Sequence, residues 1–156
     1  MEASRCLGRL QKLCSKAEHC RSDVFRKALK DLEGDREAAG KVVEALVKER
    51  YVDDARYAAA FAREKAALQG WGPVKIRFQL RGKGIPEEAI SAALAEIEPE
   101  KADAKLEKVL AAKARSLQGD PQFKLKLLKF GLTRGYNYDQ VEKAVSKIIA
   151  TFAAAE

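Results

Sequence analysis

Basic residues gather in two stretches of this sequence that contain no acidic residue. The first stretch runs from Gly72 to Gly84, and the second runs from Gln122 to Gly135. Cationic groups concentrated in this way can neutralise the phosphates of a nucleic-acid backbone or face an acidic protein groove. A solvated basic surface that only keeps the protein soluble is the alternative. The candidate binding residues are Lys75, Arg77, Arg81, Lys83, Lys124, Lys126, Lys129 and Arg134.

Two helices must position these cations. At about 100° per residue, Ile76 and Leu80 lie on one side of the first basic helix, and Val74 and Phe78 lie on nearly the opposite side. Two apolar faces predict that this helix is packed from two directions, with the basic residues in the stripes between them. The second basic helix repeats this design, with one face made of Phe123, Leu127 and Phe130 and the other of Leu125, Leu128 and Leu132.

An internal repeat organises the whole chain. Gly34, Gly84 and Gly135 each precede an amphipathic helix with a similar apolar pattern, at a period of about 50 residues, as in stacked helical units. We therefore predict an all-α fold, an elongated array of three tandem three-helix modules, over residues 1–50, 51–98 and 99–156. The expected helices span residues 3–16, 22–33, 36–50, 53–68, 73–82, 86–97, 101–117, 121–132 and 137–152.

Several residues mark the ends of these helices. The acid pair Asp53 and Asp54 stands at a predicted helix start, where carboxylates accept free amide hydrogens and favour the positive end of the helix dipole. Asn137 is followed three residues later by Gln140, a variant of the capping box. Trp71 lies in a glycine-rich joint and is interpreted as packing over the helix junction, with stacking on exposed bases as the alternative.

Composition limits the class of protein. The chain has 30 basic and 23 acidic residues, and this net charge of +7 suggests an anionic partner. It contains no apolar run near the roughly 20 residues needed to span a bilayer, and its start lacks a signal-peptide pattern. We therefore expect a cytoplasmic protein with no membrane partner.

The cysteines and the histidine predict no metal centre. Cys6 and Cys14 fall on an apolar helical stripe and are interpreted as small buried hydrophobes in a reducing compartment. Cys14, His19 and Cys20 could be combined into a metal site, but they lack a fourth ligand and the usual paired spacing. We expect no metal and no cofactor.

No enzyme class fits the sequence. It has no phosphate-binding glycine-rich loop with a lysine, no cluster of acids for a two-metal nuclease and no nucleophile beside a histidine. Two binding functions remain. One is a non-specific DNA-binding helical-repeat protein, although no helix shows a pattern for reading base edges. The other is a helical adaptor that binds only protein.

Five segments together resemble the RecX family, bacterial regulators of the RecA recombinase. They are DDARYA (Asp53–Ala58), WGPVKIRFQLR (Trp71–Arg81), KGI (Lys83–Ile85), LKFGLTRGY (Leu128–Tyr136) and CSKAEHCRSD (Cys14–Asp23). Each motif alone is weak, but their order and spacing are specific. The resemblance marks as signature or structural residues Asp53, Asp54, Arg56, Tyr57, Trp71, Gly72, Gly84 and Gly135.

This resemblance implies a function. Members of the family look like elongated arrays of three-helix modules that bind in the groove of the RecA nucleoprotein filament. There they restrain its ATPase, strand-exchange and coprotease activities. The expected partners are therefore the RecA filament and, weakly and without sequence preference, single- and double-stranded DNA, with the protein acting as a monomer. The first module departs from the pattern because it is acidic around Gly34, which puts its part in filament contact in doubt.

Overall fold

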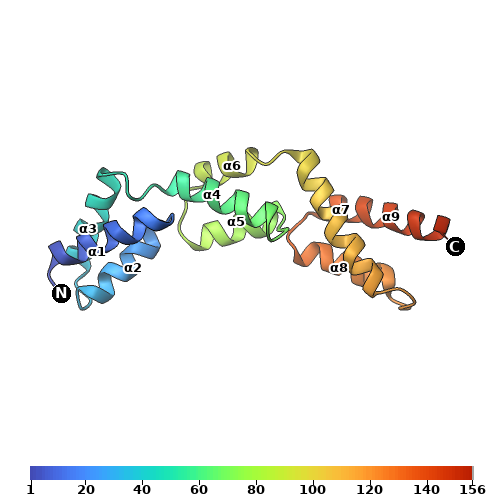
Figure 1. Ribbon diagram of the computed structural model, residues 1–156, viewed down its shortest axis with the longest axis horizontal. Helices are drawn as coiled ribbons and strands as arrows, with labels where there is room; N and C mark the ends of the chain where they lie inside the picture. The colour runs from blue at the N-terminus through green and yellow to red at the C-terminus, as the bar shows by residue number, and fades with distance from the viewer. Residues whose placement is uncertain (156) are drawn as a thin grey trace. The chain divides into compact units, whose positions relative to one another are not determined.

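The computed structural model describes residues 1–155, and over these residues the chain is all helical, with no strand (Figure 1). The predicted all-α helical array is therefore confirmed, and each expected helix agrees with an observed one to within a few residues. The nine helices are α1 (Ala3–Lys16), α2 (Arg21–Asp31), α3 (Arg36–Lys48), α4 (Asp54–Ala67), α5 (Pro73–Gly82), α6 (Glu87–Ala95), α7 (Pro99–Ser116), α8 (Phe123–Thr133) and α9 (Tyr138–Ala155). None of the helices in residues 1–155 is long and apolar enough to cross a membrane.

The chain forms two compact units. Unit 1 contains residues 1–61 and 80–93, and unit 2 contains residues 62–79 together with the chain from Leu94 onward. Helices α4 and α5 therefore each contribute residues to both units. The three-module division at residues 50 and 98 remains a prediction.

The core of unit 1 lies among α1, α2 and α3, the blue and turquoise helices that pack together in Figure 1. Each helix presents an apolar stripe at the spacing expected for one buried face. Burying one such large side chain contributes about 1.5–3 kcal/mol. The buried stripes contain Cys6 and Leu10 on α1, Val24 and Ala28 on α2, and Ala39, Val42, Val43 and Leu46 on α3.

The core of unit 2 forms where α7, α8 and α9 contact one another. Gly131 of α8 lets α9 approach closely, because a Cβ atom at this position would lie 2.6 Å from a methyl carbon of Val141. The buried side chains are Leu106, Leu110 and Ala114 on α7, Leu127 on α8, and Val141, Ala144, Val145 and Ile148 on α9.

Two of the predicted helix starts have the expected hydrogen bonds. The Asp53 carboxylate accepts the backbone N–H of Arg56 at 3.1 Å, which caps α4. At the start of α9, the Asn137 side chain accepts the backbone N–H of Gln140 at 2.9 Å. The Gln140 side chain in turn accepts the backbone N–H of Asn137 at 3.4 Å. The capping box is therefore confirmed.

The prediction that α5 is packed from two directions is wrong for this chain. Ile76 and Leu80 are fully buried, whereas Val74 is 57% exposed and Phe78 is 73% exposed. Helix α8 shows the same asymmetry, because Leu127 is buried while Leu125 and Leu132 remain 46% and 41% exposed. On each basic helix one apolar face is therefore buried and the other is largely exposed, although Leu128 of the second α8 face packs against the core of unit 2.

Candidate functional site

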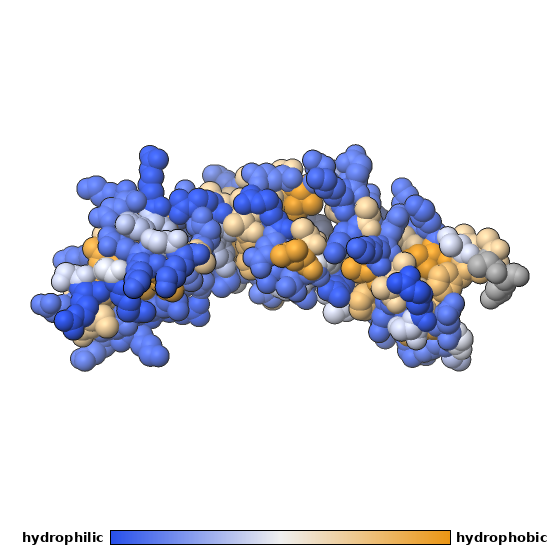
Figure 2. Space-filling view, viewed as in Figure 1, coloured by the Kyte–Doolittle hydropathy of each residue, from blue (hydrophilic) through white to orange (hydrophobic). Residues whose placement is uncertain are grey.

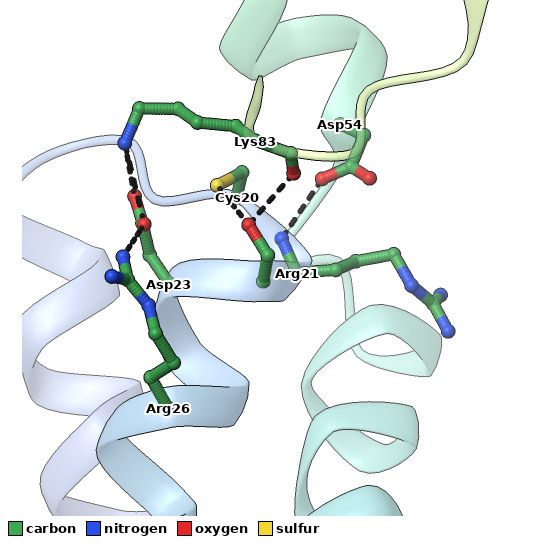
Figure 3. A network of polar contacts seen from close by, with 7 residues as sticks. Cys20, Arg21, Asp23, Arg26, Asp54 and Lys83 are labelled. Atoms are coloured by element: carbon green, nitrogen blue, oxygen red, sulfur yellow. Dashed lines mark hydrogen bonds and ion pairs between the residues drawn. The ribbon is translucent and has the colours of Figure 1, made fainter. Parts of the chain in front are cut away.

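Lys83, one of the candidate binding residues, holds two parts of unit 1 together. Its ammonium group donates to both carboxylate oxygens of Asp23 on α2, at 3.2 and 3.3 Å, and lies over the ring of Tyr57. Its backbone carbonyl accepts the Ser22 hydroxyl at 2.7 Å. Figure 3 shows the Lys83 side chain reaching across the start of α2 to Asp23, which also pairs with Arg26. With 29% of its side chain exposed, Lys83 is mainly a structural contact.

The acid pair of the signature segment has two different roles. Asp53 caps its own helix, whereas Asp54 reaches to α2 and accepts the backbone N–H of Arg21 at 2.9 Å (Figure 3). The cap position of α2 is Cys20, whose side chain makes no capping hydrogen bond. Asp54 therefore satisfies an amide at the start of a helix more than 30 residues earlier in the sequence.

Arg56 is also a structural residue of unit 1. Its guanidinium donates to Glu18 in the loop before α2 at 2.5 Å, and to the backbone carbonyls of Arg50 and Tyr51 at 3.1 and 3.3 Å. The hydrogen bond with Glu18 raises the pKa of Arg56 above its ordinary value, so the cation is retained at every accessible pH. Asp54 and Arg56 thus bind the start of α2 and the loop between α1 and α2.

A joint of similar design occurs in unit 2. Arg134 donates to the backbone carbonyl of Gln69 at 2.6 Å, and its own carbonyl accepts the backbone N–H of Gly72 at 2.7 Å. The carbonyl of Gly135 accepts the backbone N–H of Val74 at 2.9 Å. The backbone segments approach so closely that a Cβ atom on Gly72 would lie 2.4 Å from the Gly135 carbonyl oxygen.

Lys83 and Arg134 occupy equivalent repeat positions, directly before Gly84 and Gly135. In both units the backbone carbonyl of this residue accepts a hydrogen bond from an earlier segment of the chain. Its side-chain cation donates a hydrogen bond to an acceptor in the same earlier segment. We call Lys83 and Arg134 the joint cations. The first repeat has the acidic Glu33 before Gly34. The sequence alone predicted partner binding for the joint cations, because their hydrogen-bond acceptors are distant in the sequence.

Loss of the Lys83 ammonium should destabilise unit 1 by about 1 kcal/mol, the order expected for a half-buried charged hydrogen bond. Burial alone would raise the pKa of Asp23, but hydrogen bonds from Cys20 and Lys83 and the charge of Lys83 lower it overall. Burial would likewise lower the pKa of Lys83, but the interactions with Tyr57 and Asp23 raise it. The Lys83–Asp23 pair should therefore make its full contribution to the stability of unit 1 between about pH 4 and pH 10, the ordinary pKa values of the Asp and Lys side chains.

The measurement is the free energy of unfolding of Lys83→Met and the wild type across this pH range. The wild-type advantage should disappear as the pH falls through the lowered pKa of Asp23, or rises through the raised pKa of Lys83. Lys16→Met, at an exposed position on α1, is the matched control and should cost little at any pH. A deficit of Lys83→Met that is equally large at pH 2 would assign the loss to packing of the lysine stem instead.

The other candidate cations differ in their surroundings. Lys75 is half-buried, with its ammonium 4.4 Å from the centre of the Trp71 ring, over which Lys65 also lies at 5.0 Å. Trp71 is thus occupied by cations within unit 2, which favours the packing interpretation over base stacking. Arg77 is half-buried on α5.

The remaining candidates lie in exposed positions on α5 and α8. Arg81 donates to Glu87 at 3.2 Å with 62% of its side chain exposed. Lys126 pairs with Asp120 at 2.6 Å, and this hydrogen bond, with one from the backbone N–H of Gln122, lowers the pKa of Asp120. Lys124 and Lys129 are exposed on α8. Lys124 and Lys129 are therefore the candidates best placed to meet a partner in unit 2.

The cysteine and histidine side chains give no sign of a metal centre. Cys6 and Cys20 are buried, Cys14 is half-buried, and all three are free thiols. Burial raises the pKa of each of these thiols, so they stay protonated and unreactive at neutral pH. Within the described part of the chain, no group of three or more His, Cys, Asp or Glu side chains is arranged to hold a metal ion.

An all-helical array in which Gly34, Gly84 and Gly135 each precede an amphipathic helix defines the class as a helical-repeat protein. Residues 53–94 match the family model for the second three-helix domain of RecX. This chain belongs to the RecX family.

Relatives named regulatory protein RecX support this assignment. The protein from Xanthomonas axonopodis pv. citri is 44% identical over 87 residues, which are 55% of this chain and 52% of the relative. The protein from Clostridium botulinum is 30% identical over 119 residues, or 74% of this chain and 55% of that relative. This chain thus spans about half the length of the curated relatives it matches.

Two solved structures share the fold. A crystal structure of regulatory protein RecX has a TM-score of 0.80 and 26% identity, covering 90% of this chain and 70% of that chain. RecX from Lactobacillus salivarius has a TM-score of 0.78 and 20% identity, covering 95% of this chain and 97% of that chain. The second likeness concerns the fold alone.

Proposed function

We propose that this chain binds the RecA nucleoprotein filament and inhibits the ATPase, strand-exchange and coprotease activities of RecA in recombination, DNA repair and the SOS response. The observation that carries the proposal is the match of residues 53–94 to the second three-helix domain of RecX. This segment contains α5, whose charged residues are all basic. The protein acts by binding rather than by catalysis, without a cofactor, as a cytoplasmic monomer.

Two of the candidate cations are less suited to this role than the others. Lys83 and Arg134 are engaged in the joints of their units, so their replacement would disturb the fold before it informed on binding. We propose that filament contact is made by cations on α5 and α8. They are Lys75, Arg77, Arg81, Lys124, Lys126 and Lys129.

Non-specific DNA binding is the second candidate function, and the net charge of +7 favours it. Cations that neutralise about four phosphates would give a slope of roughly −3 to −4 when log K is plotted against log salt. We expect this slope for naked single-stranded DNA. The RecA filament should stay bound at a salt concentration that releases the naked DNA, because protein contacts add to the phosphate contacts.

The experiment is a salt titration of binding to labelled single-stranded DNA, with and without bound RecA. If the affinities for naked DNA and for the filament fall in parallel as the salt concentration rises, the chain functions as a DNA-binding protein. A flat response on naked DNA, with the filament still bound, would favour the adaptor that binds only protein.

A further inference from the structure

Helix α5 has an apolar face exposed to solvent within unit 2. Val74 and Phe78 stand one helical turn apart and are 57% and 73% exposed, and the half-buried Arg77 lies at the edge of this face, about 60° from Val74 around the helix. Large apolar side chains this exposed on neighbouring turns of one helix are unusual for a surface that meets only water.

Helix α8 carries a corresponding face in the same unit. Counting from Gly84 and Gly135, Val74 corresponds to Leu125 and Phe78 corresponds to Lys129. Leu125 and Leu132 are 46% and 41% exposed, and Lys129 lies between them on the same side of α8. Both faces therefore mix large apolar side chains with cations and contain no acid.

We propose that these outward faces dock a protein surface that is both apolar and acidic. We call Val74, Arg77 and Phe78 on α5, with Leu125, Lys129 and Leu132 on α8, the docking faces. Figure 2 shows orange hydrophobic patches over the middle of the chain and over its C-terminal third. The inference rests on the proposed function, in which this acidic and apolar surface belongs to the protein part of the filament.

The chemistry of the docking faces favours a protein partner over nucleic acid. Phosphates need cations alone, and bases stack on aromatic side chains, so the aliphatic Val74, Leu125 and Leu132 would gain little from either. Apolar side chains with an arginine among them are typical of the centres of protein interfaces. Because both faces carry cations and no acid, the complementary surface of the partner is negatively charged.

The test compares two double variants that remove similar exposed apolar side chains from unit 2. Val74→Ser with Phe78→Ser changes a docking face. The control, Leu68→Ser with Tyr138→Ser, changes residues that are 74% and 54% exposed and lie outside the docking faces. Because all four side chains are exposed, both variants should keep the wild-type helical circular dichroism and melting midpoint.

Each protein is titrated onto RecA filaments assembled on single-stranded DNA with a non-hydrolysable ATP analogue, and onto the same DNA without RecA. The docking-face variant should bind the filament at least about tenfold more weakly, while its affinity for naked DNA changes less than about twofold. The control should match the wild type in both titrations.

Three results would overturn the inference. Equal losses on filament and naked DNA would show that Phe78 and Val74 contact nucleic acid. If the docking-face variant binds the filament with the wild-type affinity, the docking faces do not contact the filament, and the proposed function still holds. Failure of the wild-type protein to bind the filament would remove the proposed function and this inference with it.

Discussion

Replacing Gly135 by alanine should destabilise the protein far more than the same change at the equivalent Gly84. Both glycines have a positive φ, +94° at Gly135 and +75° at Gly84, a region that costs an L-residue about 1–2 kcal/mol. A Cβ atom at Gly135 would also lie 2.2 Å from the Cβ of Lys75 and 2.7 Å from its backbone nitrogen, whereas a Cβ atom at Gly84 would meet no other part of the described chain within 4 Å.

The clash cannot be relieved by a side-chain rotation, because backbone atoms of α5 are involved. We therefore expect Gly135→Ala to lower the free energy of unfolding by at least about 3 kcal/mol, the range of severe overpacking. Gly84→Ala should lose only the backbone contribution of about 1–2 kcal/mol. Denaturant unfolding followed by circular dichroism measures both losses.

The comparison separates backbone strain from close approach, since the two variants differ only in the second. Gly82→Ala serves as a baseline, because Gly82 has no positive φ and no neighbour within 4 Å. Equal losses for Gly135→Ala and Gly84→Ala would mean that the α8–α9 joint does not lie against the start of α5 as described.

Reversing two exposed charges on α8 should give the largest loss of binding. Lys124→Glu with Lys129→Glu replaces two cations by two carboxylates on a helix that contains no acid. If a polyanionic filament is the partner, like-charge repulsion replaces attraction, and affinity at about 0.1 M salt should fall by more than about tenfold. Co-sedimentation with RecA filaments measures this loss.

The matched control is Lys12→Glu with Lys16→Glu, two exposed positions on α1 that give the same change in net charge. The control should lose much less affinity, because none of the candidate binding residues lies on α1. Both variants should melt like the wild type. Retention of full affinity by the α8 variant would assign the basic stretch of α8 to ordinary solvated charge.

The helices and their ends could be predicted because their signals are local. The 3.6-residue periodicity, the Asp53 cap and the Asn137–Gln140 box each act within a few residues, and the structure has all three. The three glycines that precede the repeated helices could be recognised for the same reason. In the structure Gly34, Gly84 and Gly135 all have a positive φ.

The roles of individual polar residues could not be predicted, because their partners are distant in the sequence. Lys83 and Asp23 are 60 residues apart, and Arg134 and Gln69 are 65 apart. A count of basic residues along α5 and α8 cannot separate the joint cations from the exposed ones. Likewise, periodicity identified Val74 and Phe78 as a second apolar face but could not show that this face stays largely exposed among the described residues.

The most direct test of the account is the effect of the purified chain on RecA. Single-stranded-DNA-dependent ATP hydrolysis by the RecA of the same organism is followed while the chain is added below one copy per RecA. We predict that the rate falls at these ratios, and that the Lys124→Glu, Lys129→Glu variant requires at least about tenfold more protein for the same effect. An unchanged rate, at a protein concentration that saturates the filament or exceeds RecA, would contradict the proposed inhibition.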